Sequence, residues 1–190
     1  MRSSLCTLLA AALSLSLLLS AALRADDWPQ WRGLNRDGVC NETGLLELFP
    51  AKGLEVRWRA PVGWGWSSPV VAQGRVYLAD SEVVRPQPKE RLHCFDEATG
   101  KALWTHSYDV AYPDWAFPER GPTATPIVLD GKVYALGNKG DLHCLDADRG
   151  TVLWKLNLEK EYDVQEFAFN ASPLIEGDLL IACIGSYPGD

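Results

Sequence analysis

The stretch LHCFDEATGKALW, residues 92–104, occurs again fifty positions later as LHCLDADRGTVLW, residues 142–154. Seven of the thirteen positions are identical in the two copies. A self-match at a fixed period of this length is typical of repeat proteins, in which one supersecondary unit is stacked several times. The repeat therefore decides the fold before any other feature of the sequence.

Short apolar runs surround both copies, and Gly-containing turns separate these runs. Ser-Pro-Val-Val at 68–71 matches Thr-Pro-Ile-Val at 125–128 and Ser-Pro-Leu-Ile at 172–175. Each unit holds four antiparallel strands in about 45–50 residues, which indicates a blade of an all-β propeller. A β-sandwich is the alternative, but it would not repeat a thirteen-residue string. We expect blades at about residues 66–108, 121–158 and 168–190, the third being truncated.

Residues 1–25 have the pattern of a secretory signal peptide. An apolar run of Leu, Ala and Ser from Leu5 to Leu23 precedes small residues, and cleavage is expected after Ala22 or Ala25. An uncleaved membrane anchor is the alternative, because the run is near spanning length. Cleavage predicts a periplasmic or secreted protein without a transmembrane anchor.

Residues 26–53 are dense in Trp, Pro and Gly and have no clear period. They predict an irregular N-terminal segment whose Trp28 and Trp31 pack on the following domain. Residues 54–190 are expected to form the partial propeller, and the alternation from Glu55 to Val62 predicts one strand ahead of the first full blade.

The charge balance excludes one class of partner. The formal net charge is −7, the pI is about 5.0, and no basic run occurs. Phosphate binding needs concentrated Lys and Arg, so nucleic acid is not an expected partner. The same composition argues against a polybasic patch for a membrane surface.

The repeated residues have structural explanations. A glycine ends the turn between the third and fourth strands, where a left-handed conformation carries no steric penalty for it. An aspartate four positions earlier can cap that turn by accepting backbone N–H groups. A tryptophan recurs on the outermost strand, where we expect it to pack between adjacent blades. The predicted blade-docking residues are Trp58, Trp104, Trp154, Gly100, Gly150, Asp96 and Asp146.

Histidine and cysteine give no sign of chemistry. Cys94 and Cys144 occupy equivalent repeat positions, too far apart for a disulfide, and are expected to be buried strand residues. No pair of cysteines has CxxC spacing, and His93 and His143 are likewise repeat equivalents. The sequence therefore indicates no catalytic and no metal-ligating residue.

One weak signal suggests a ligand site. The residues three positions before each repeated proline are Trp66, Thr123 and Asn170. In a blade these positions lie where the innermost strand begins, near the central channel. They differ between units while the framework stays the same, which is typical both of binding sites on a rigid scaffold and of ordinary loop variation.

The pattern of Asp96, Thr99, Gly100, Lys101, Leu103 and Trp104 resembles the tryptophan-docking repeat of pyrroloquinoline-quinone (PQQ) type propellers. The second copy departs from it at Arg149 and Thr151. The opening DWPQWRG…NRDG is similar to the start of many exported PQQ-like repeat proteins. The resemblance covers about residues 26–190 and implies one of two functions. BamB-like members bind partner proteins in the cell envelope, whereas the other branch comprises alcohol and sugar dehydrogenases that use PQQ and calcium.

The resemblance favours a binding or scaffold module over an enzyme. The dehydrogenase branch uses adjacent cysteines, a tryptophan stacked on the quinone, and acidic and Asn ligands to calcium, and this chain has no adjacent cysteines and no dense acidic cluster. We therefore expect protein partners in the cell envelope and no cofactor. The alternative is the N-terminal part of a PQQ-dependent dehydrogenase whose catalytic residues lie elsewhere, and PQQ and calcium belong to that alternative only.

A propeller closes with four to eight blades. The sequence offers one strand, two full blades and half of a third, and bare strand edges invite pairing with other chains. We expect either the N-terminal part of a longer protein of roughly eight blades or copies that assemble to close a ring, and the stop within a blade favours the first.

Overall fold

The computed structural model describes residues 25–84, 86–112, 121–162, 164 and 169–185. Most of the predicted signal peptide, residues 1–24, lies outside these ranges. The chain divides into two compact units. The described part of the first comprises residues 25–26 and 41–44, in which the Asp26 amide donates to the Glu42 carboxylate at 2.6 Å. The second comprises residues 27–40 and the chain from Leu45 onward.

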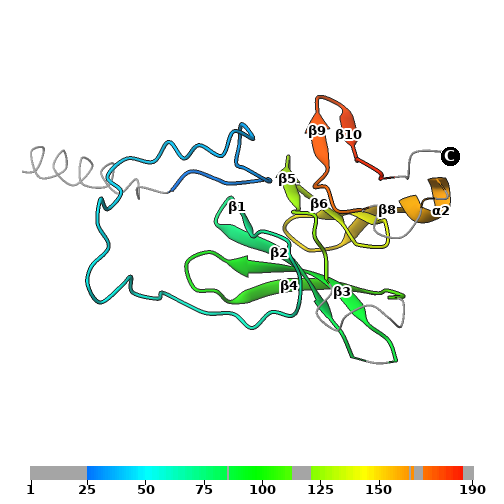
Figure 1. Ribbon diagram of the computed structural model, residues 1–190, viewed down its shortest axis with the longest axis horizontal. Helices are drawn as coiled ribbons and strands as arrows, with labels where there is room; N and C mark the ends of the chain where they lie inside the picture. Colours follow the sequence, from blue (N-terminus) through cyan, green and yellow to red (C-terminus); the bar gives the residue numbers. More distant parts are fainter. Residues whose placement is uncertain (1–24, 85, 113–120, 163, 165–168, 186–190) are drawn as a thin grey trace, which may run out of the picture. The chain divides into compact units, whose positions relative to one another are not determined.

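The second unit is built from antiparallel sheets, as predicted (Figure 1). Two four-stranded sheets have their strands in chain order, β1-β2-β3-β4 and β5-β6-β7-β8. The strands of the first sheet are β1 (Val70–Ala72), β2 (Arg75–Glu82), β3 (Lys89–Asp96) and β4 (Ala102–Asp109). Those of the second are β5 (Ile127–Leu129), β6 (Lys132–Leu136), β7 (Asp141–Asp146) and β8 (Val152–Asn157). These sheets are successive propeller blades.

A third blade begins with the hairpin of β9 (Leu174–Glu176) and β10 (Leu179–Ile181). A short helix, α2 (Leu158–Tyr162), follows β8. Within the described residues, no helix is long and apolar enough to cross a membrane.

The two full blades share their register as well as their sequence. Tyr77 pairs with Cys94 in the first blade, and Tyr134 pairs with Cys144 in the second. The register between the third and fourth strands shifts directly after each cysteine. The repeat therefore specifies even the irregularity of the sheet.

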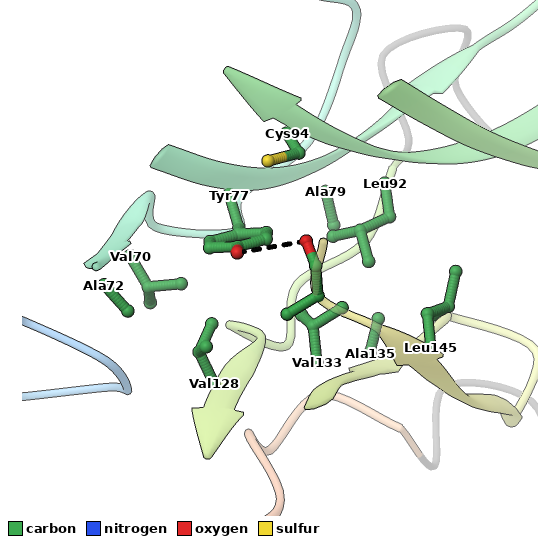
Figure 2. Packing of buried hydrophobic residues seen from close by; sticks show 11 residues of the cluster. Val70, Ala72, Tyr77, Ala79, Leu92, Cys94, Val128, Val133, Ala135 and Leu145 are labelled. Carbon is green, nitrogen blue, oxygen red and sulfur yellow. Dashed lines mark hydrogen bonds between the residues drawn. The ribbon is translucent and has the colours of Figure 1, made fainter. Parts of the chain in front are cut away.

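The main apolar core lies between the two full blades. One face of the first sheet presents Tyr77, Ala79, Leu92 and Cys94, and the second sheet presents Val133, Ala135 and Leu145 toward it (Figure 2). The Tyr77 hydroxyl donates to the Ala147 carbonyl at 3.3 Å, so the one polar atom of this ring is satisfied across the seam. Full burial of an aliphatic side chain contributes about 1.5–3 kcal/mol, and this seam is therefore a major source of stability.

A second core covers the opposite face of the second blade. Leu136 and Leu142 pack there with Phe169 and with partly buried residues that include Leu180 of the third blade. Alternate residues of β6 and β7 thus point to opposite seams, as period-two alternation requires. The second blade therefore has apolar clusters on both of its faces.

The predicted strand at Glu55–Val62 is wrong in this structure. These residues have no regular strand assignment, and Val56 and Val62 are exposed. A strand exists through hydrogen bonds to a neighbour, and no described strand lies beside this segment. Apolar and polar residues do alternate in this segment, but no strand among the described residues pairs with it.

The N-terminal residues 27–40 are irregular, as predicted, and they contact the blades. Trp28 is half-buried and forms a two-way backbone bridge with Val71 of β1. Trp31 is about half exposed. Of the two tryptophans in this segment, Trp28 is therefore the one that is bound to a strand of the first blade.

Candidate functional site

A tryptophan and a glycine of the repeat meet at two places, where Trp58 lies on Gly100 and Trp104 lies on Gly150. The Trp58 indole nitrogen donates to the Glu97 carbonyl at 2.8 Å, and that of Trp104 donates to the Ala147 carbonyl at 3.0 Å. Glu97 and Ala147 each follow the repeated aspartate. Two successive seams therefore use the same hydrogen bond.

The turn glycines lie under these rings. A Cβ atom at Gly100 would come within 2.5 Å of the Trp58 ring, and one at Gly150 within 2.5 Å of the Trp104 ring. Both glycines also have positive φ, +71° and +68°. Glycine is thus required twice over, by the turn and by the tryptophan of the preceding blade.

The repeated aspartates hold the same turns. Asp96 Oδ1 accepts the Thr99 amide at 2.8 Å, and Asp146 Oδ1 accepts the Arg149 amide at 2.8 Å. These bonds leave Asp96 and Asp146 as turn-forming residues.

Trp154 has the same geometry relative to its neighbouring tyrosine as Trp104, but no turn glycine among the described residues lies against its ring. Its ring lies 6.0 Å from that of Tyr134 at 56°, as Trp104 lies 5.9 Å from Tyr77 at 56°. Trp154 is nevertheless 42% exposed.

The structure brings two of the sequence-predicted ligand residues together. The amides of Trp66 and Ser67 both donate to the Pro122 carbonyl at 2.9 Å, so Trp66 lies beside the residue that precedes Thr123. Thr123 in turn donates its amide to Asn138 Oδ1 at 3.3 Å. Trp66 itself is 77% exposed. The backbone of Trp66 is therefore held in place by hydrogen bonds, while its indole ring is exposed to solvent.

The backbone at this entrance is closely packed. Trp64 and Ser81 exchange hydrogen bonds of 3.0 and 2.7 Å. A Cβ atom at Gly63 would lie 2.0 Å from the Ser81 carbonyl, and one at Gly121 would lie 2.0 Å from the Trp64 carbonyl. Only glycine allows these chains to approach so closely, and the result is a rigid platform for two exposed tryptophans, since Trp64 is 54% exposed.

Asn170 lies on the segment that leads into the third blade and is exposed. It belongs to the same repeat position as Trp66 and Thr123, and its part in a common site stays a prediction.

Beneath Thr123 lies a buried carboxylate that sequence reasoning missed. Glu90 is 0% exposed and accepts the hydroxyls of Tyr108 and Tyr112 at 2.6 Å and the Asn138 amide at 3.1 Å. Burial raises the pKa of Glu90 above its usual value, although these hydrogen bonds oppose the shift. Asn138 links this carboxylate to Thr123, because its backbone amide donates to Glu90 and its side-chain oxygen accepts the Thr123 amide. Its side-chain nitrogen also donates to the Gly121 carbonyl. The first blade thereby fixes the loops that form the entrance.

Another missed feature joins the inner strands directly. Thr125 Oγ1 accepts the Ser68 amide at 3.2 Å, and the Thr125 amide donates to Ser172 Oγ at 2.8 Å. Each of these residues precedes a repeated proline. The sequence contained a signal for this contact, because Ser-Pro, Thr-Pro and Ser-Pro stand at equivalent positions of the three copies. The side-chain hydroxyl before the proline is the group that the three copies share.

We expect Thr125→Val to lower the free energy of unfolding by about 1–3 kcal/mol, because it keeps the shape but leaves the Ser68 amide without its acceptor. Thr151→Val is the matched control, since Thr151 is exposed on the turn before β8. Urea unfolding would measure both changes. Equal midpoints for the two variants would contradict a role for the hydroxyl.

A buried ion pair occupies the first blade's other face. Asp80 accepts two hydrogen bonds from Arg91, at 2.8 and 2.7 Å, and one from the Gly63 amide. His93 Nε2 lies 3.0 Å from Asp80 Oδ1 without meeting hydrogen-bond geometry. Burial disfavours the charge on Asp80, but contacts with His93, Arg91 and Gly63 outweigh it and hold its pKa well below the usual range. These bonds tie the segment before Trp64 to the blade.

A cavity of about 440 Å³ lies in the seam between the first two blades. Among its lining residues are Tyr108, Asp141, His143 and Lys155. The His143 ring lies 4.4 Å from that of Tyr108 and 5.0 Å from that of His106. His143 Nδ1 and His106 Nε2 are buried and have no hydrogen-bond partner among the described residues. The lining charges have both signs.

The described residues contain no group of three or more His, Cys, Asp or Glu side chains able to hold a metal ion. Cys94 and Cys144 are buried free thiols, as predicted, and Cys40 and Cys183 are exposed and free. Burial raises the pKa of Cys94 to about 11, so this thiol is unreactive at neutral pH.

The four-stranded blades and their docking tryptophans define a β-propeller repeat protein of the PQQ-like kind. A profile of the family described as outer membrane protein assembly factor BamB matches residues 44–189. The chain belongs to this family, which confirms the resemblance that the repeat indicated.

A curated relative is the outer membrane protein assembly factor BamB of Shewanella oneidensis, 30% identical over 164 residues. The match covers 81% of this chain and 37% of the relative, so the chain spans little more than a third of that protein's length.

The fold is also that of a solved structure. The quinohemoprotein alcohol dehydrogenase of Comamonas testosteroni is similar over 90% of this chain and 25% of its own, with 21% identity and a TM-score of 0.52. The BamB structure from Moraxella catarrhalis matches 63% of this chain and 42% of its own, with 15% identity and a TM-score of 0.36.

Proposed function

We propose that this chain is part of a cell-envelope propeller that binds protein partners at the entrances of its inner strands. The observation that supports this most directly is Trp66, whose ring is largely exposed while its backbone is held against Pro122. Exposed aromatic residues on a rigid backbone are favoured anchors at protein interfaces, because they bury a large area with little loss of conformational entropy.

The family supports the same role. The curated relative is an outer membrane protein assembly factor. By analogy, the partner of this chain is an outer membrane protein or a component that assembles one, met on the periplasmic side after the signal peptide is removed. Thr123 and Asn170 would border the anchor, and Glu90 would hold the platform beneath it without touching the partner.

The test is site-specific photo-cross-linking in the full-length protein within the native envelope. A cross-linker replacing Trp66 should give discrete adducts with one or a few envelope proteins, and a cross-linker at Lys101, exposed beside the turn before β4, should not. With the partner identified from the adduct, Trp66→Ala should weaken binding by about tenfold or more.

The full-length protein can also be used to distinguish this binding function from the alternative, a PQQ-dependent dehydrogenase activity. Tight binding of PQQ with calcium, together with dye-linked alcohol oxidation, would replace the binding role by a dehydrogenase activity. Identical adducts from positions 66 and 101 would leave the entrance without a special role and would contradict the proposal.

A further inference from the structure

The N-terminal residues 27–37, here called the strap, contact the inner strands of three successive blades. Trp28 and Val71 of β1 exchange backbone hydrogen bonds of 2.7 and 3.0 Å. The Val128 amide of β5 donates to the Pro29 carbonyl at 2.9 Å. Arg36 Nη2 donates to the Pro173 carbonyl, directly before β9, at 2.8 Å.

These contacts lie on the free edge of the inner strands. β1 and β5 are the first strands of their sheets, and β2 and β6 take up their other edges. The amides of Val71 and Val128 point away from those neighbours and toward the strap. In a propeller the free edge of the innermost strand faces the central axis. The strap therefore lies on the axis side of the blades, and Figure 1 shows it reaching β1 and β5.

The strap has a fixed conformation of its own. Gln30 accepts the Gly33 amide at 3.0 Å on its carbonyl and the Arg36 Nε at 2.9 Å on its side chain. A Cβ atom at Gly33 would lie 2.9 Å from the Trp28 ring, so the strap folds tightly over that ring. Arg32 and Arg36 have positive φ, 65° and 59°, which non-glycine residues adopt only where the surroundings enforce it.

We propose that the strap fills the propeller axis beside these three inner strands and fixes the spacing between successive blades. Unpaired edge amides invite pairing with other chains, and the strap satisfies two of them. It also leaves the strand entrances open. Trp66, five residues before Val71, remains 77% exposed. The strap has this role whatever molecule binds at the entrances.

The test is amide hydrogen exchange in the full-length protein, compared with a variant that lacks residues 27–37. We expect the amides of Val71 and Val128 to exchange at least about tenfold faster in the deletion variant, because carbonyls of the strap accept both amides. The amides of β7, which is flanked by strands on both sides, are the internal control and should keep their protection.

A pair of point variants keeps the test decisive if the deletion prevents folding. Arg36→Ala removes the bond to the third blade together with the bond to Gln30 within the strap, whereas Arg32→Ala removes a bond that stays within the strap, to the Asp37 carbonyl. Both residues have similar positive φ, so the backbone effect is matched. Faster exchange of the Val128 amide in Arg36→Ala than in Arg32→Ala supports the proposal. Equal exchange in the two variants, or unchanged exchange in a folded deletion variant, overturns it.

Discussion

Replacing Gly150 with alanine is expected to lower the free energy of unfolding by about 3 kcal/mol or more. The new Cβ atom would lie 2.5 Å from Cδ2 of the Trp104 ring, far inside van der Waals contact. The turn also holds φ at +68°, which disfavours any side chain. The ring cannot retreat freely, because its indole nitrogen is hydrogen-bonded to the Ala147 carbonyl. Urea unfolding monitored by tryptophan fluorescence would measure the change.

The chain contains a matched control at Gly131. Its φ is +70°, nearly that of Gly150, but a Cβ atom there would meet nothing within 4 Å. Gly131→Ala should therefore lower the free energy of unfolding by only about 1–2 kcal/mol, the backbone effect alone. The difference between the two variants isolates the contact between blades.

A double-mutant cycle makes this interpretation sharper. In the Trp104→Ala background the ring is gone, so Gly150→Ala should have about the same effect as Gly131→Ala. An undiminished effect of Gly150→Ala in that background would show that the turn, and not the docked ring, requires glycine.

The sequence predicted this seam in two separate pieces. It assigned Gly100 and Gly150 to a left-handed turn and the tryptophans to the space between blades. The structure shows that they are one contact, in which each ring covers the glycine of the next repeat. Spacing along one chain does not reveal which residues of neighbouring repeats touch, because that depends on how the blades stack.

Other parts of the site had different signals. The hydroxyl before each repeated proline was visible at Ser68, Thr125 and Ser172, and a search for shared chemistry at equivalent positions would have found it. The Glu90 network had no such signal. Its tyrosines and Asn138 occur once, outside the repeated string. Tyr108 is the cross-strand partner of Glu90 within the first blade, whereas only the packing of the second blade brings Asn138 to this carboxylate.

The segment at residues 54–62 shows that alternation along the sequence can predict a strand where the structure contains none. Its alternation is that of a strand, and Trp58 docks on Gly100 as Trp104 docks on Gly150. The side-chain contact thus forms while the strand does not, because a ladder needs a neighbour and docking needs only the next blade.

Acidification is expected to destabilise the fold through His143. This side chain is 4% exposed, and its Nδ1 has no partner among the described residues. Burial, then the nearby His106 and Lys155, lower the pKa of His143 to about 4. Charging the ring inside the seam would also place a second cation near Lys155, which lines the same cavity.

The direction of the effect follows from proton binding. The unfolded chain protonates His143 near its ordinary pKa of about 6.5, whereas the folded chain resists protonation until about pH 4. Between these values the unfolded state binds more protons, so the free energy of unfolding decreases as the pH falls from about 6.5 to about 4. A difference of this size corresponds to about 3 kcal/mol. Above pH 6.5 this contribution no longer changes.

Two variants and one direct measurement check this prediction. His143→Phe keeps an aromatic ring beside Tyr108 but cannot titrate, so its free energy of unfolding should depend less on pH between 4 and 6.5 than that of the wild type. Lys155→Met removes a cation that opposes protonation, so it should raise the pKa of His143 and narrow the window. Imidazole resonances followed by NMR report the titration itself. A His143 resonance that titrates near pH 6.5 in the folded protein would contradict the assignment, since a ring buried without a partner cannot accept a proton at its solution value unless the seam opens.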